Sequence, residues 1–123
     1  MLTSIRLLTR DVDTLVAFYE RLTGRTADRL APVFAEIRHP GSTTLAVADA
    51  STVPAAQAAA NRSVLLEFRV EDVDAEFARL DPAEVVQGPT TMPWGNRSAL
   101  FRDPDDNLVN LFTPLTEQAR ARS

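Results

Sequence analysis

The chain of 123 residues contains no cysteine and only one histidine, His39. Without cysteine it can form no disulfide, no thiolate metal site and no cysteine nucleophile. Catalytic zinc sites are built from His, Cys and carboxylates, so one histidine is a poor basis for such a site. With only four glycines, the sequence also has no glycine-rich loop of the kind that holds phosphates.

The chain also lacks an excess of positive charge, and it has no long apolar run. The 13 basic residues, all arginine, are outnumbered by 17 acidic ones, and the net charge is −4. We therefore expect no nucleic-acid partner. No apolar run approaches the roughly 20 residues that a bilayer requires, and residues 1–11 lack the layout of a signal peptide. These features predict a cytoplasmic protein that has no membrane partner.

What is present indicates one globular domain built from two similar halves. Hydrophobic residues make up 45% of the chain and charged residues 24%, which is typical of such domains. Each half begins with an apolar strand, at 4–9 and at 63–70, followed by an aspartate that can cap a helix, Asp11 or Asp72. Apolar residues then recur at helical spacing. Further strands are predicted at 33–38, 43–48, 85–87, 98–102 and 108–112.

The repeat predicts an α+β fold of two βαβββ modules that form a curved mixed sheet with helices outside and a concave cleft inside. One module alone would leave a sheet face uncovered and an edge unpaired. Within the single domain 1–123, module 1 covers about residues 1–50 and module 2 about residues 62–114. A small, alanine-rich linker spans about 51–61, and the tail 115–123 is expected to fray.

Three segments carry a family resemblance. They are Pro93-Trp94-Gly95-Asn96-Arg97, the run FRDPDDNL at 101–108 and the run DVDTLVAFY at 11–19. The sequence resembles the glyoxalase / bleomycin-resistance / extradiol-dioxygenase superfamily, also called vicinal oxygen chelate. The resemblance covers about residues 2–114. The family usually writes the turn as DPDGN, and here Asp106 replaces the glycine.

Family enzymes typically hold a divalent metal with His and Glu side chains on the first and last strands of each module. By resemblance, these positions fall at Ser4, Ala46, Leu65 and Asn110. None of the four is a good ligand for a transition metal. His39 is expected in a solvent-exposed turn. We therefore predict no metal and no cofactor.

Strand alternation selects the residues that face the predicted cleft. Arg6 and Glu67 occupy equivalent positions on the first strands of the modules and could form an ion pair. That pair would be either a polar anchor for a ligand or a contact at an edge or a dimer interface. On the last strand, Asn110 and Phe112 should face inward, where Asn110 offers both a donor and an acceptor.

Three more residues are candidates for ligand binding, each with a structural alternative. Trp94, in the turn at the cleft rim, could stack on a flat ligand or anchor its loop by packing. Phe34 could form a second apolar wall or belong to the core. Arg97 could contact the ligand or form a salt bridge to Asp103 or Asp105. The predicted ligand-binding set is Arg6, Phe34, Glu67, Trp94, Arg97, Asn110 and Phe112, with no catalytic residue.

The resemblance and the missing metal ligands favour a metal-free protein that binds small, planar, drug-like molecules, of the bleomycin-resistance type that confers antibiotic resistance. The first alternative is a lyase, isomerase or oxygenase of the same superfamily, using an unforeseen metal site or Glu36 or Glu67 as a base. The second is a non-binding structural or regulatory module whose cleft is filled by its own side chains. A homodimer is expected, because family members often pair in this way and exposed sheet edges need partners.

Overall fold

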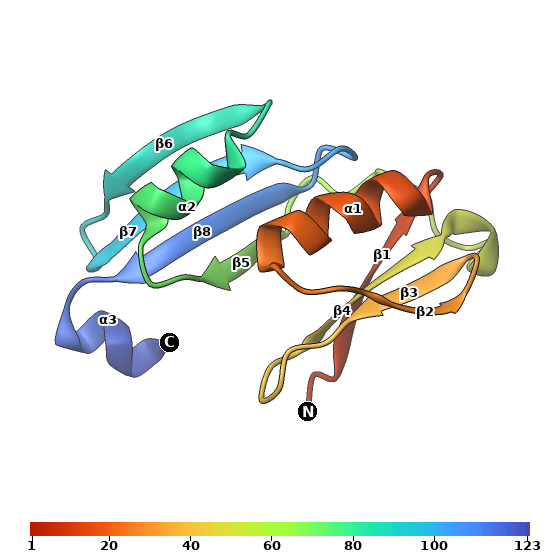
Figure 1. The fold of residues 1–123 in the computed structure, drawn as a ribbon, viewed down its shortest axis with the longest axis horizontal. Helices are drawn as coiled ribbons and strands as arrows, with labels where there is room; N and C mark the ends of the chain where they lie inside the picture. Colours follow the sequence, from red (N-terminus) through yellow and green to blue (C-terminus); the bar gives the residue numbers. More distant parts are fainter. The chain divides into compact units, whose positions relative to one another are not determined.

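The computed structural model describes residues 1–123, and the chain divides into two compact units, Met1–Ala60 and Asn61–Ser123. Both units have the same order of elements: a strand, a helix and then three strands (Figure 1). The units are described one at a time. None of the helices has the length and apolar character that crossing a bilayer requires.

The first unit is a four-stranded mixed sheet in the order β1-β4-β3-β2, with β1 parallel to β4 and the other pairs antiparallel. Helix α1 packs on β3 and β4 (Figure 1). The elements are β1 (Ser4–Thr9), α1 (Val12–Thr23), β2 (Asp28–Ala31), β3 (Phe34–Ile37), β4 (Thr44–Asp49) and the 3₁₀ turn η1 (Ala50–Thr52).

The ends of α1 follow from its sequence. Asp11 accepts a hydrogen bond from the amide of Thr14 at 3.1 Å, which satisfies a free N–H of the first turn. Gly24 ends the helix with a left-handed φ of 70°, a conformation that glycine adopts without strain. The apolar side chains between these caps recur at helical spacing and are buried: Val12, Leu15, Val16, Tyr19 and Leu22.

The second unit repeats this architecture with the sheet order β5-β8-β7-β6, where β5 is parallel to β8. Asp72 caps α2 through the amide of Ala75, as Asp11 caps α1. The elements are β5 (Leu65–Arg69), α2 (Val73–Leu80), β6 (Val85–Thr91), β7 (Asn96–Arg102), β8 (Leu108–Pro114) and α3 (Glu117–Arg122).

The strand registers show how closely the units correspond. Arg6 on β1 lies opposite Ala46 on β4, and Glu67 on β5 lies opposite Asn110 on β8. The predicted α+β fold of two βαβββ modules is confirmed, and its strands are organised as two mixed sheets of four strands each.

The prediction that residues 115–123 fray is wrong, because most of this segment forms α3. Thr116 caps the helix by accepting a hydrogen bond from the amide of Ala119 at 3.1 Å. Ala119 is fully buried, so the helix is held by packing as well as by its cap. A helix this short is unstable in isolation, which is why its own sequence pattern gave no signal.

Candidate functional site

The sheet of the second unit has two different faces. Phe101 on β7 meets Phe77 of α2, with ring centroids 6.5 Å apart, so odd-numbered positions of β7 here face the helix. Leu100 therefore lies on the other face, and the register places Asn110 and Glu67 beside it. We call this side, which is turned away from α2, the open face.

Asn110 and Glu67 are joined on the open face. The Asn110 side-chain Nδ2 donates a hydrogen bond to Glu67 Oε2 at 2.9 Å. Asn110 is only 7% exposed, whereas Glu67 is exposed. The other amide atom of Asn110, Oδ1, is buried and receives no hydrogen bond from the chain. The structure thus brings two of the predicted ligand-binding residues together.

Phe112 extends the open face from Asn110. It is half-buried and lies opposite Arg69 of β5. Arg69 in turn donates a hydrogen bond from Nη1 to the main-chain oxygen of Ser123 at 3.0 Å. The residue that follows α3 is therefore tied to the same face of the sheet, a contact that sequence reasoning missed because 54 residues separate its partners.

Trp94 lies in the turn between β6 and β7, and it is 56% exposed. Its turn is closed by a hydrogen bond from the Met92 amide to the Asn96 carbonyl at 2.7 Å. The neighbouring Gly95 has a φ of 95° and accepts a hydrogen bond from the Leu115 amide at 2.8 Å. The backbone of the turn is thus fixed by main-chain contacts, while more than half of the Trp94 surface faces solvent.

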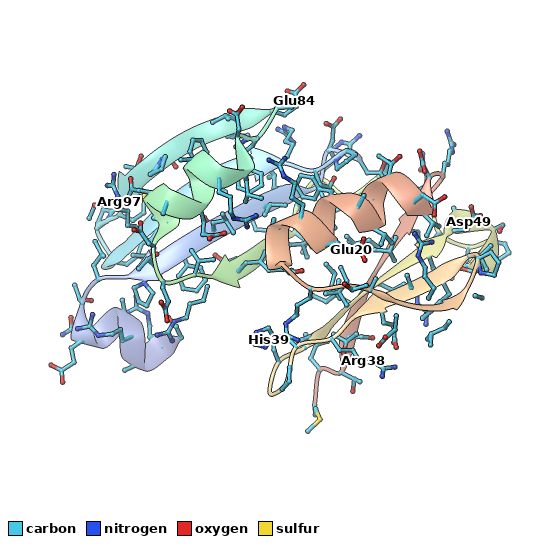
Figure 2. All side chains as sticks on the ribbon, viewed as in Figure 1. Glu20, Arg38, His39, Asp49, Glu84 and Arg97 are labelled. Atoms are coloured by element: carbon cyan, nitrogen blue, oxygen red, sulfur yellow. The ribbon has the colours of Figure 1, made fainter.

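Arg97 forms an ion pair, but not with either of the two aspartates that the sequence suggested. Neither Asp103 nor Asp105 is its partner: Arg97 donates from Nε and Nη2 to the two carboxylate oxygens of Asp74, at 2.7 and 2.9 Å. This hydrogen bond lowers the pKa of Asp74 below its ordinary value. Arg97 thereby links β7 to the first turn of α2, on the face of the sheet that the helix covers (Figure 2). A contact between Arg97 and a ligand stays a prediction.

In the first unit, Arg6 and Phe34 are in contact. The Arg6 guanidinium carbon lies 4.9 Å from the centroid of the Phe34 ring, a cation–π geometry. Phe34 is half-buried, so it is neither a core side chain nor fully in solvent. An ion pair between Arg6 and Glu67 would join the two units, and it stays a prediction.

Glu36 belongs to a small charge network that the sequence did not reveal. Arg38 donates a hydrogen bond to Glu36 at 2.6 Å and approaches Asp28 at 3.8 Å, and the hydrogen bond to Glu36 raises the pKa of Arg38. Residues two apart on a strand share a face, which is the signal that could have suggested the Glu36–Arg38 pair.

The residues at the positions to which the resemblance assigns the family's metal ligands do not fit a divalent ion. Ser4 and Ala46 in the first unit and Leu65 and Asn110 in the second supply no imidazole and no carboxylate. The chain has no group of three or more His, Asp or Glu side chains placed to share an ion. His39 is exposed in the loop between β3 and β4, where its Nδ1 lies 3.2 Å from the Pro40 carbonyl oxygen (Figure 2).

Comparison with known families matches this architecture. The family model described as Glyoxalase/Bleomycin resistance protein/Dioxygenase superfamily matches residues 2–111. The chain belongs to this superfamily. The predicted resemblance is therefore confirmed over most of the chain. No match was found among curated proteins.

Several solved structures have the same fold. A glyoxalase/bleomycin resistance protein/dioxygenase from Nocardioides is 28% identical with a TM-score of 0.76, and the match covers 95% of this chain and 85% of that one. A family enzyme from Burkholderia phytofirmans PsJN is 19% identical with a TM-score of 0.82, covering 93% and 98%. TioX from Micromonospora sp. ML1 is 24% identical with a TM-score of 0.70, covering 94% and 99%.

Proposed function

We propose that this superfamily member is a metal-free binding protein for a small, planar, drug-like organic molecule, as in the bleomycin-resistance branch of the family. The proposal rests on one correspondence, which the family resemblance supplies. The four positions that hold a metal in family enzymes are occupied here by Ser4, Ala46, Leu65 and Asn110. These side chains offer no imidazole and no carboxylate for an ion, whereas apolar and amide groups are usual in sites for organic molecules.

The open face of the second unit has the composition of a small-molecule site. Leu65 is 41% exposed, and the half-buried Leu108 and Phe112 flank Asn110 along β8. Binding sites typically combine such apolar surface with a few polar groups that orient the ligand. Glu67 and Asn110 supply those polar groups. Binding of this kind is capture, in which no covalent bond of the ligand is made or broken.

Aromatic side chains supply flat surfaces in both units. Trp94 presents an exposed indole, and the half-buried Phe34 has the Arg6 guanidinium over one face of its ring, which leaves the other face for a ligand. Stacking on such rings favours planar ligands, and each aromatic contact adds roughly 0.5–1.5 kcal/mol beyond burial of area. We also propose that the protein acts as a homodimer, because the edge strand β6 exposes Val85 and Val86 at 49% and 52%.

A thermal-shift screen against planar antibiotics, intercalators and dyes tests the proposal. A ligand present at 100 times its Kd should stabilise the protein by about 2.7 kcal/mol, which raises Tm by several degrees. Trp94→Ala should weaken the shift, whereas Leu30→Ala, which removes another exposed apolar side chain, should not. A screen in which no compound raises Tm would support the non-binding module instead.

The enzyme alternative is tested on the same preparation. The protein is expressed in medium supplemented with zinc, iron, nickel and manganese, and its metal content is measured after purification. The proposal expects a metal content well below one ion per chain. A stoichiometric ion that is lost on mutation of Glu67 or Glu36 would favour the enzyme.

A further inference from the structure

Asn110 stands out among the buried polar groups of the second unit. It lies on β8, which has strands on both sides, and its sequence neighbours Val109 and Leu111 are fully buried. Its Oδ1 atom nevertheless has no hydrogen-bond donor from the chain. Buried polar atoms are nearly always satisfied, so this oxygen, unlike the Nδ2 atom that bonds Glu67, has no role in the fold that the structure shows.

The hydrogen bond to Glu67 fixes which way the amide points. Nδ2 donates to the carboxylate, so the reverse orientation would place Oδ1 against a negatively charged oxygen. A carboxylate accepts several hydrogen bonds, and Asn110 uses one of those positions on Glu67. The result is two adjacent acceptors, one neutral and buried and one anionic and exposed.

Two adjacent acceptors select the chemistry of whatever binds between them. An anion or a carbonyl oxygen would be repelled, whereas a charged N–H group can satisfy both acceptors at once. The nearby cation on the same strand face, Arg69, is itself bound to the Ser123 oxygen. The net charge of −4 on the chain also favours a cationic ligand over an anionic one.

We propose that Glu67 and Asn110 form an acceptor pair that binds the cationic N–H group, an ammonium or an amidinium, of a planar ligand. This inference rests on the proposed function and names the ligand class for the same site. Glu67 is exposed and meets the cation first. Asn110 Oδ1 is buried in the free protein, so its bond to the cation forms when side chains beside it on the open face move; its neighbours there in the strand register are Leu100, Leu108 and Phe112.

Three naphthalene probes separate charge from hydrogen bonding at constant ring size. Naphthalene-2-carboxamidine carries a cation with N–H donors, 2-naphthyltrimethylammonium carries a cation without them, and naphthalene-2-carboxylate carries an anion. Binding is measured by isothermal titration calorimetry at low salt, where charge interactions are least screened. The amidine should bind at least about tenfold more tightly than either of the others.

Two variants test whether Glu67 and Asn110 cause the preference for the amidine. Asn110→Leu should weaken amidine binding about tenfold, while the Tm of the free protein stays the same or rises because an unsatisfied amide has been removed. Glu67→Gln should remove most of the preference for the cation over the anion. Glu117→Gln, which removes an exposed charge from α3, is the matched control. It should change neither the affinity for the amidine nor the preference for the cation over the anion.

The outcomes are distinguishable. If the carboxylate probe binds as tightly as the amidine, or if both Asn110→Leu and Glu67→Gln bind the amidine like the wild type, the acceptor pair is overturned. In that case hits in the thermal-shift screen would still support the proposed function. If Asn110→Leu does not fold, the amide has a structural role, and the exposed Glu67→Gln substitution alone decides the ligand class.

Discussion

The Arg122 side chain of α3 donates a hydrogen bond from Nη2 to the main-chain oxygen of Trp94 at 2.7 Å. The turn that carries Trp94 is thereby joined to the last helix of the chain. Ala119 on the same helix is fully buried, and a Cβ added to Gly95 would lie 3.3 Å from its methyl group. α3 thus restrains the turn that carries Trp94, through one hydrogen bond and through packing.

Loss of the hydrogen bond from Arg122 should make the Trp94 turn more mobile. We expect Arg122→Ala to increase acrylamide quenching and speed the fluorescence depolarisation of Trp94, because the turn loses a charged hydrogen-bond donor. Since Trp94 is the only tryptophan, fluorescence reports on this turn alone. Arg10→Ala, which removes an exposed arginine of the first unit, is the control. Identical quenching in the two variants would mean that α3 does not restrain the turn.

The second prediction concerns the close packing of Gly95. Gly95→Ala should destabilise the protein by about 2 kcal/mol, because its φ of 95° disfavours a side chain and the added Cβ would collide with the Thr116 hydroxyl. Gly88→Ala is the matched control, since nothing lies within 4 Å of its added Cβ, and it should change stability by less than about 0.5 kcal/mol. Urea denaturation of both variants measures the difference.

Local signals in the sequence predicted the helices α1 and α2, one in each unit. Asp11, Gly24 and Asp72 act at short range, and each occupies the helix end that its residue type favours. Because both modules use the same strand-aspartate-helix order, the repeat could be recognised from the sequence. Strand alternation also places Glu67 and Asn110 on one face, in agreement with the hydrogen bond between them.

Contacts between distant segments could not be predicted in this way. Arg97 on β7 and its partner Asp74 on α2 are 23 residues apart, and no helical or strand period relates their positions. The tail looked featureless because α3 depends on burial of Ala119 and on the bond from Arg122 to the Trp94 turn. Tertiary packing stabilises such short helices, and no local pattern reports it.

The third prediction follows from the pairing of Arg97 with Asp74. The hydrogen bond from Arg97 lowers the pKa of Asp74 from its ordinary 3.8. A depressed carboxylate pKa stabilises the fold above the unfolded-state pKa, and this contribution is lost as pH falls through the folded-state value. Asp74→Asn should therefore lower Tm by at most a few degrees at pH 7, and the difference should vanish in strong acid.

The repeat supplies the control for this pH series. Asp13 is the counterpart of Asp74 on α1, and it pairs with Arg29 at 2.9 Å while its side chain is 85% exposed. An exposed ion pair contributes little, so Asp13→Asn should change Tm less than Asp74→Asn at pH 7. Thermal melts of both variants between about pH 2 and pH 7 measure the two effects. If Asp74→Asn lowers Tm by the same amount at about pH 2 as at pH 7, the effect does not arise from ionisation of the Asp74 carboxylate.

The last prediction concerns the turn between β7 and β8, where Asp106 replaces the glycine that the family usually has. Asp106 has a φ of 63°, which costs an L-residue about 1 kcal/mol relative to glycine. The turn tolerates this because the buried Asp103 accepts hydrogen bonds from the Asp105 and Asn107 amides, at 2.8 and 2.9 Å. Asp106→Gly should stabilise the protein by about 0.5 kcal/mol, Asp106→Asn by less, and Asp106→Ala should destabilise it. Equal stability of the glycine and alanine variants in urea denaturation would show that the strain at Asp106 is absorbed elsewhere in the turn.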